Sequence, residues 1–221
     1  MNKLHIPPLD EQAAKTALEH QKILAKPPLA LGKLEPVAIQ IAAMTGNPAP
    51  RLKDKAVVLF AADHHIADHG LSLTSTDVTY IQTRNFLQGG GTINAFTRNA
   101  GARLSVVDVG VNYDFGDLPG LVKRKVMHGA NDFSRGPAMT REQALECLQV
   151  GIDMAREEKA RGLDIVAAGE MGIGNTTPSS AIVAVLTGTP VETVTGRGSG
   201  VKGEVIRKKI ELIEQGIALN N

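Results

Sequence analysis

The sequence contains no tryptophan, and aromatic residues make up only 3% of its 221 residues. Proteins that bind single-stranded nucleic acid use aromatic side chains as stacking platforms, so this scarcity argues against that class. An excess of positive charge is also missing, because 24 lysine and arginine residues are balanced by 23 aspartate and glutamate residues. We therefore expect neither nucleic acid nor an anionic membrane surface as a partner. A small-molecule ligand is favoured.

Cysteine is nearly absent, and the single Cys147 excludes a disulfide within the chain. Its place inside a helical pattern predicts a buried thiol rather than a nucleophile, in a reducing compartment. No stretch approaches the roughly 20 apolar residues of a membrane-spanning helix. Residues 1–10 also lack the apolar core of a signal peptide. From these absences we expect a cytoplasmic protein that does not enter a membrane.

What the chain does contain is an alternation of apolar runs and helical patterns, with 43% hydrophobic residues for a core. We predict an N-terminal helical segment over residues 1–50 and an α/β nucleotide-binding domain over residues 51–221. Within the first segment, helical spacing at residues 10–24 and 34–44 is ended each time by prolines, which cannot donate a backbone hydrogen bond.

Three apolar runs in the larger segment predict buried parallel strands covered on both faces. They lie at residues 56–62, 104–109 and 163–168. Helical patterns follow them at residues 77–88, 92–100, 140–162, 178–186 and 202–219. This order predicts an α/β fold with a three-layer, doubly wound, mostly parallel sheet of the Rossmann-like type. The ligand should then lie beyond the carboxyl ends of the strands.

The most informative segment is Gly169–Thr177, with the sequence GEMGIGNTT, between the third run and a helix. Glycines permit a tight turn and a close ligand, and the free N–H groups of a first helical turn attract an anion such as phosphate. The spacing is that of a nucleotide-triphosphatase P-loop, but Asn175 replaces the required lysine, which argues against an ATPase. The alternative is a connection whose glycines serve only close packing.

A second glycine loop, Gly196–Gly200, has the sequence GRGSG and precedes the last helical pattern. Arg197 and the loop N–H groups could hold a second side of the anion. On the helix, Lys209 lies at the edge of the apolar stripe and Lys208 points away, so Lys209 can reach toward a pocket. That stripe is formed by Ile206, Ile210, Ile213 and Ile217. A solvated lysine is the alternative.

Polar residues follow all three strands, so they should share one rim of the sheet. The densest group comprises Asp63, His64, His65, Asp68 and His69. An Asp-His-His triplet is typical of manganese-dependent phosphoesterases, whose metal suits carboxylate and imidazole ligands. Those enzymes need earlier aspartates, which nothing before Asp63 supplies. We therefore expect no metal and no cofactor, with Asp63 and His64 fixing the loop by hydrogen bonds.

Taken together, these segments resemble the family of nicotinate-nucleotide–dimethylbenzimidazole phosphoribosyltransferases, which build the lower-ligand nucleotide of cobalamin. The resemblance extends over about residues 56–217, in family order. The matching stretches are FAADH at 60–64, VT, NFL, GG and IN within 78–94, VVDVG at 106–110, AMTRE at 138–142, Gly169–Thr177, and Gly196–Gly200 with Lys209.

The resemblance implies a three-layer α/β homodimer that moves the phosphoribosyl group of nicotinate mononucleotide to a benzimidazole-type base. The product would be α-ribazole 5′-phosphate, with nicotinate released. The implied nucleotide and phosphate site consists of Glu170, Gly172, Gly174, Asn175, Thr176, Gly196, Arg197, Gly198, Ser199, Gly200 and Lys209. The implied wall of the aromatic-base slot, residues 72–82, includes Ser72, Ser75 and Gln82. Without the resemblance, Gln82 would be an exposed helix residue.

Two departures from the family pattern matter. His65 stands where the family has glycine, and the catalytic glutamate of the family is expected beyond Asn221. The catalytic residue is therefore unassigned, with Glu170 as a candidate assisting carboxylate. The alternatives are a nucleotide-binding protein or half-enzyme subunit without its own base, and the metal-dependent phosphoesterase. A reading frame that continues past Asn221 would favour the enzyme over the binding protein.

Overall fold

The computed structural model describes residues 5–220, which form two compact units. The first unit ends at Lys53 and the second begins at Asp54. No helix among the described residues is long and apolar enough to cross a membrane.

The first unit is a pair of helices, α1 (Glu11–Ile23) and α2 (Leu34–Thr45). The Asp10 side chain caps α1 by accepting a hydrogen bond from the Ala13 N–H at 2.8 Å, and the left-handed Gly46 ends α2. Lys26, in the segment that connects the helices, forms an ion pair of 2.7 Å with Glu35 of α2. Both predicted helices are confirmed within about one residue at each end.

The second unit is built on a parallel four-stranded sheet with the order β3-β2-β1-β4. Its strands are β1 (Lys55–Ala62), β2 (Ala102–Gly110), β3 (Leu121–Lys123) and β4 (Ile165–Met171). Its helices are α3 (Val78–Leu87), α4 (Thr92–Ala100), α5 (Arg141–Ala160), α6 (Thr176–Thr187), α7 (Val191–Val194) and α8 (Glu204–Asn220), with a 3₁₀ turn η1 at His65–His69. The chain adds β2 and β3 on one side of β1 and then crosses to β4 on the other side.

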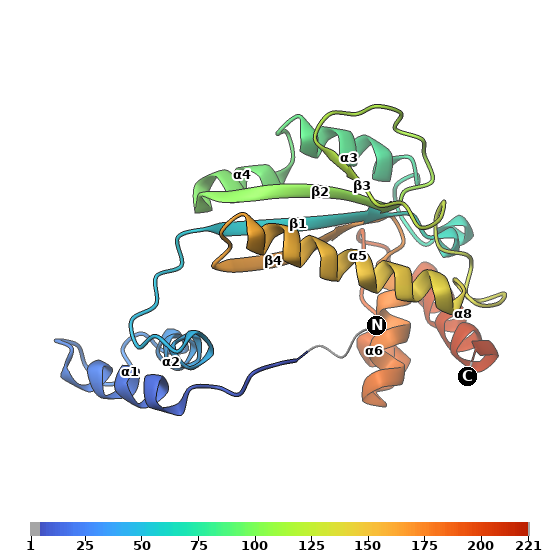
Figure 1. Ribbon diagram of the computed structural model, residues 1–221. Helices are drawn as coiled ribbons and strands as arrows, with labels where there is room; N and C mark the ends of the chain where they lie inside the picture. The colour runs from blue at the N-terminus through green and yellow to red at the C-terminus, as the bar shows by residue number, and fades with distance from the viewer. Residues whose placement is uncertain (1–4, 221) are drawn as a thin grey trace. The chain divides into compact units, whose positions relative to one another are not determined.

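Alternate residues of the central strands build separate cores on the two faces of the sheet. Leu59 and Val106 pack with side chains of α3 and α4, whereas Val58 and Val107 pack with Val150 and Met154 of α5. Accordingly, α3 and α4 cover one face and α5 covers the other, with α6 and α8 near the carboxyl ends of the strands (Figure 1). The predicted α/β architecture is confirmed.

Three details of the sequence prediction were wrong. β4 is a strand as predicted, but it is an edge strand and not buried, with Ile165 42% and Val166 45% exposed. Among the described residues β4 pairs only with β1, so it lies at the edge of the sheet, and the layers that bury the central strands leave its residues 165–168 exposed. The short β3 was missed, because two apolar residues are too few to show a pattern. Cys147 is half-buried rather than fully buried, and desolvation raises the pKa of its thiol.

Candidate functional site

The loops after β1, β2 and β4 meet at the carboxyl rim of the sheet. The Asp63 N–H donates to the Gly110 carbonyl at 2.9 Å, which joins the ends of β1 and β2. On the other side of β1, a Cβ on Gly172 would lie 2.3 Å from the Ala62 carbonyl oxygen. The strand order reverses at β1, and such a switch point is where open α/β sheets bind ligands.

The first glycine loop is packed closely against the loop after β1. No side chain fits at Gly172, where a Cβ would also approach the His64 Nε2 to 3.1 Å. Gly174 has a φ of +88°, and a Cβ there would lie 2.7 Å from the Cβ of Ala67. The glycines thus serve close packing of the chain on itself, as well as shaping the turn into α6.

The start of α6 retains free hydrogen-bond donors. The N–H groups of Asn175 and Thr177 donate to the carbonyls of Gly172 and Gly174. Those of Gly174 and Thr176 have no acceptor among the described residues. Just before the loop, desolvation raises the pKa of the Glu170 carboxyl and a hydrogen bond from Asn175 opposes the rise. Because Glu170 is exposed, solvent screens most of this effect.

Lys209 is the most unusual charged residue of the site, because only 1% of its surface is exposed. Its Nζ donates to the Thr176 hydroxyl at 2.7 Å and to the Gly196 carbonyl at 3.2 Å. Among the described residues, no carboxylate forms an ion pair with it. Desolvation lowers the pKa of this lysine. The arrangement is a buried cation whose counter-ion is not supplied by the described part of the chain.

The depth of Lys209 follows from which face of α8 is buried. The buried residues of α8 are Lys209, Leu212, Ile213 and Gly216. Their spacing of three and four residues defines one helix face. The predicted stripe through Ile206 and Ile210 was therefore wrong in its centre, since both residues are only half-buried. Lys209 lies on the buried face rather than at its edge.

The second glycine loop folds over the ammonium group of Lys209. A Cβ on Gly198 would lie 2.8 Å from the Thr176 hydroxyl oxygen and 3.6 Å from the Lys209 Nζ, and its φ is +53°. A pocket of about 290 Å³ opens between this loop and the start of α6. It is lined by Thr176, Ser179, Ser180, Val183, Val194, Gly196 and Gly198. We call Gly172–Thr176, Gly196–Gly200 and Lys209 the candidate phosphate site.

Within the described residues, two predicted members of this site, Arg197 and Ser199, form no hydrogen bond with Lys209 or Thr176. Arg197 is exposed, and its side chain contacts no described partner, although its carbonyl accepts from the Gly200 N–H. Ser199 turns toward the loop before α3, where its hydroxyl accepts from the Leu73 N–H at 3.0 Å and hydrogen-bonds the Ser72 hydroxyl at 3.0 Å. Ser72 and Ser199, expected in different subsites, are therefore neighbours.

The other two residues of the predicted base slot contact local partners. The Ser75 hydroxyl donates to the Asp77 carboxylate at 3.2 Å, at the start of α3. The Gln82 carbonyl accepts from the Asn85 amide at 3.1 Å, and Gln82 lines an open pocket of about 380 Å³ with other α3 residues. Gln82 is half-buried.

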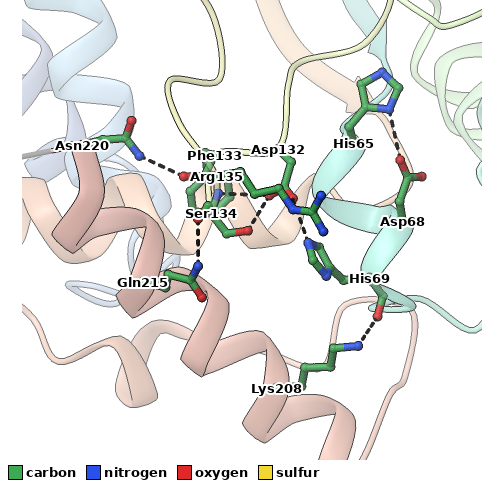
Figure 2. A network of polar contacts seen from close by, with 10 residues as sticks. All are labelled: His65, Asp68, His69, Asp132, Phe133, Ser134, Arg135, Lys208, Gln215 and Asn220. Atoms are coloured by element: carbon green, nitrogen blue, oxygen red, sulfur yellow. Dashed lines mark hydrogen bonds and ion pairs between the residues drawn. The ribbon is translucent and has the colours of Figure 1, made fainter.

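A polar network holds α8 in place and thereby positions Lys209 (Figure 2). From α8, Lys208 donates to the His69 carbonyl at 2.7 Å and Gln215 to the Ser134 carbonyl at 3.0 Å. The His69 Nε2 lies 2.8 Å from the Asp132 carboxylate. Burial raises the pKa of Asp132, but hydrogen bonds from Ser134 and His69 outweigh it and hold the pKa below its ordinary value.

The histidine-rich loop after β1 is fixed by its backbone and by Asp63. The Asp63 carboxylate accepts from the Asn112 N–H at 2.8 Å, whereas the His64 side chain makes no hydrogen bond to the described residues. Burial lowers the pKa of His64, against the opposing charge of Asp63. The His65 ring fits because it lies against Gly129, which has a φ of +75° and no side chain. A Cβ at Gly129 would lie 3.0 Å from the His65 Nε2. Within residues 5–220, no three histidine, cysteine or acidic side chains gather to hold a metal ion.

Several residues around the site were missed by sequence reasoning. The Thr79 hydroxyl, fully buried on α3, accepts from the Ile173 N–H at 3.1 Å and so ties α3 to the first glycine loop. Tyr80 stacks on Tyr113 with ring centroids 4.4 Å apart. Ser179 lines the pocket above the candidate phosphate site. A threonine inside a helical pattern gives no sign of its partner. The sequence has only two tyrosines, and a contact between them was a possibility that the sequence alone could have suggested.

Comparison with known proteins places the chain in one family. The DBI_PRT family model, described as phosphoribosyltransferase, matches residues 6–221. A nicotinate-nucleotide–dimethylbenzimidazole phosphoribosyltransferase of Geobacter sulfurreducens is 48% identical over 213 residues, covering 96% of this chain and 60% of that protein. One of Chloroflexus aggregans is 47% identical over 98% of this chain and 61% of its own length.

The structural comparison agrees. The crystal structure of CobT from Thermus thermophilus superimposes with a TM-score of 0.90 at 43% identity, covering 94% of this chain and 62% of that one. The chain spans about 60% of the length of the curated relatives that it matches. With the family model and the relatives in agreement over nearly all of its residues, the chain belongs to the DBI_PRT phosphoribosyltransferase family.

Proposed function

We propose that this chain binds nicotinate mononucleotide and takes part in the transfer of its phosphoribosyl group to 5,6-dimethylbenzimidazole. The products are α-ribazole 5′-phosphate and nicotinate, as in cobalamin biosynthesis. The relatives carry the name of this reaction, and the family membership makes it the best-supported activity for the chain.

The observation that carries the proposal is the buried, unneutralised Lys209 between two glycine loops. Burying a charge without a partner is costly, so a site of this kind is completed by a ligand of opposite charge. The free N–H groups of Gly174 and Thr176 at the start of α6 add donors and the positive end of a helix dipole. A phosphate monoester satisfies the lysine and the N–H groups together.

The aromatic base belongs beside the phosphate site, on the wall formed by residues 72–82. The hydrogen bonds between Ser199 and the Ser72–Leu73 segment join this wall to the second glycine loop. Glu170, at the end of β4, is assigned to substrate contact as an assisting carboxylate, and no described residue is assigned the role of principal base. The reaction needs no metal or other cofactor in this scheme.

We further propose a homodimer, as the family resemblance implies. The outer side of α6 exposes Ile182, Val185 and Leu186, which is apolar surface that a second copy would bury. Sedimentation velocity tests this point, because Leu186→Lys should shift a dimeric parent toward monomer. The free thiol of Cys147 suits a reducing compartment, and we propose the cytoplasm.

Calorimetry with two ligands tests the phosphate site. Nicotinate mononucleotide should bind, and nicotinate riboside, which lacks the phosphate, should bind at least roughly 10-fold more weakly, because charge-assisted hydrogen bonds are lost. Equal affinities would show that the phosphate does not contribute and would contradict the proposal. Binding without any transfer of the phosphoribosyl group would instead support the nucleotide-binding protein.

A further inference from the structure

A polar pocket of about 190 Å³ lies at the carboxyl end of β1, outside the candidate phosphate site. It is lined by Asp63, His64, His65, Asp68, Thr76, Asp77, Tyr80 and Asn112. These residues come from three segments: the loop after β1, residues 76–80 at the start of α3, and Asn112 after β2. None of the contacts that hold Lys209 or the two glycine loops uses the pocket-facing carboxylates.

Asp63, which lines this pocket, leaves one strong hydrogen-bond acceptor unused. The residue is only 7% exposed, and its Oδ2 accepts from the Asn112 N–H at 2.8 Å. Its Oδ1 is buried and has no hydrogen-bond partner among the described residues. Buried polar atoms are nearly always paired, and an unpaired carboxylate oxygen is among the costliest to leave. The pocket therefore requires a donor from outside the described residues.

The pocket adjoins both subsites proposed for the substrate. On one side, the His64 ring abuts the first glycine loop, where a Cβ on Gly172 would be 3.1 Å from its Nε2. On the other side, Thr76 and Asp77 belong to the base-slot wall itself, where the Ser75 hydroxyl donates to Asp77. In a mononucleotide the sugar joins the phosphate to the base. A pocket that adjoins both subsites is where we expect the sugar.

The donor that fits is a sugar hydroxyl. Carboxylates accept hydrogen bonds from ribose hydroxyls in other nucleotide sites, where an acidic residue selects the hydroxylated sugar. Asp63, Asp68 and Asp77 give the pocket acceptors and negative charge, which do not suit a second phosphate. A metal ion is a poorer fit, because no three ligands gather for one within residues 5–220.

We infer that Asp63 is a substrate-binding residue whose Oδ1 accepts a hydrogen bond from a ribose hydroxyl of the nucleotide, making this chain select ribosyl over deoxyribosyl substrates. The inference rests on the proposed function, since it places the sugar from the phosphate and base subsites. It assigns a role to Asp63 beyond fixing the loop after β1.

The test compares nicotinate mononucleotide with its 2′-deoxy and 3′-deoxy analogues by calorimetry. The parent should bind at least one deoxy analogue roughly 10- to 100-fold more weakly, which is the loss of one hydrogen bond to a charged group. Asp63→Ala removes the acceptor. It should reduce the ratio of the two dissociation constants, that of the deoxy analogue over that of nicotinate mononucleotide, to near one. Asp63→Asn keeps the shape but loses the charge, so its ratio should fall between those of the parent and Asp63→Ala.

Asp153→Asn is the matched control, because Asp153 lies on α5 outside the pocket, where its side chain is 45% exposed and paired with Arg156. It should keep the ratio of the parent. If the Asp63 variants do not fold, the carboxyl carbon resonance of Asp63 in the parent gives the second measurement. It should shift with nicotinate mononucleotide and shift less with the analogue that lacks the contacting hydroxyl.

The outcomes separate the two proposals. If the parent binds the ribosyl and both deoxyribosyl compounds equally, or if Asp63→Ala binds with an unchanged ratio, the sugar contact is wrong and the phosphate site stands. The same holds if the Asp63 resonance does not respond. If the parent binds neither nicotinate mononucleotide nor inorganic phosphate, the proposed function fails, and this inference fails with it.

Discussion

At the scale of single residues, the candidate site depends on one lysine held in an environment that disfavours its charge. Lys209 has polar neighbours, the Thr176 hydroxyl and the Gly196 carbonyl, that accept its hydrogen bonds without neutralising it. Such an arrangement stabilises the ammonium enough to keep it in place and leaves its charge available to a ligand.

Replacing Lys209 should therefore weaken nucleotide binding more than replacing its neighbour. Lys209→Met keeps the length of the side chain, and we expect it to lose about 1.5–3 kcal/mol of binding free energy for nicotinate mononucleotide. Arg207→Met is the control, because this neighbour on α8 is exposed and forms an ion pair with Glu204 at 3.7 Å, outside the residues assigned to the site. Calorimetry measures both, and equal affinities for Lys209→Met and the parent would remove Lys209 from the site.

The lowered pKa of Lys209 predicts that the stability of the ligand-free protein depends on pH. The pKa of this lysine is lowered in the folded state, so between that pKa and the ordinary value of 10.5 the unfolded chain binds the extra proton. The free energy of unfolding should then rise with pH across this window. Urea unfolding of the parent and of Lys209→Met measures the effect as a difference, which should grow in favour of the parent toward high pH. A difference that stays constant would mean that the lysine is not desolvated.

Saturating nicotinate mononucleotide adds a check on this pH dependence. Because a bound phosphate favours the charged lysine, it should raise the pKa of Lys209 and move the window toward higher pH. If the ligand leaves the pH dependence unchanged, its phosphate does not lie next to Lys209.

At the scale of elements, Gly172 of the loop after β4 and Gly151 of α5 have opposite roles. Gly172→Ala would drive a methyl group into the Ala62 carbonyl and should destabilise the fold by about 1–3 kcal/mol. Gly151→Ala, in the middle of α5 with nothing within 4 Å of the new methyl group, should stabilise it by about 0.5–1 kcal/mol. Urea unfolding distinguishes the two, and similar effects at both positions would show that Gly172 is not a packing glycine.

The elements also show how far the sequence could predict this structure. Local signals were sufficient for the capping box of α5, where the Gln143 N–H donates to Thr140 and the Thr140 N–H donates to Gln143. They were insufficient for burial, because the exposure of β4 depends on its place at the edge of the sheet and on what packs over its faces, which the residues of the strand do not encode. The apolar stripe and the resemblance both assigned Lys209 to the site, but its depth follows from the packing of α8 and the second glycine loop, which no local pattern encodes.

The contacts between distant segments were the least predictable part of the candidate site. Ser72 and Ser199 are 127 residues apart in the sequence, and neither pattern indicated that the two hydroxyls would meet. The open oxygen of Asp63 likewise appears only once Asn112 is seen to satisfy the other one. A strand-end position predicts that a polar residue lies on the rim, but not which of its atoms remains free.

At the scale of the whole molecule, binding and transfer should separate. Residues 1–221 contain both glycine loops, Lys209 and the wall of the base slot, which are the groups that we assign to binding. They correspond to about 60% of the length of the relatives. The resemblance places the family's catalytic glutamate outside this part. We therefore expect residues 1–221, assayed by themselves, to bind nicotinate mononucleotide and to transfer its phosphoribosyl group poorly.

We expect a large loss in the rate of phosphoribosyl transfer. Lack of a positioned general base costs roughly 10²–10⁴-fold in rate, and imperfect orientation of the two bases adds to it. The measurement is the formation of α-ribazole 5′-phosphate from nicotinate mononucleotide and dimethylbenzimidazole, with the Geobacter sulfurreducens relative as the positive control. If residues 1–221 matched that relative in rate, the base would have to lie within them. Glu170→Gln would then be the first variant to assay, because Glu170 is the carboxylate nearest in sequence to the first glycine loop.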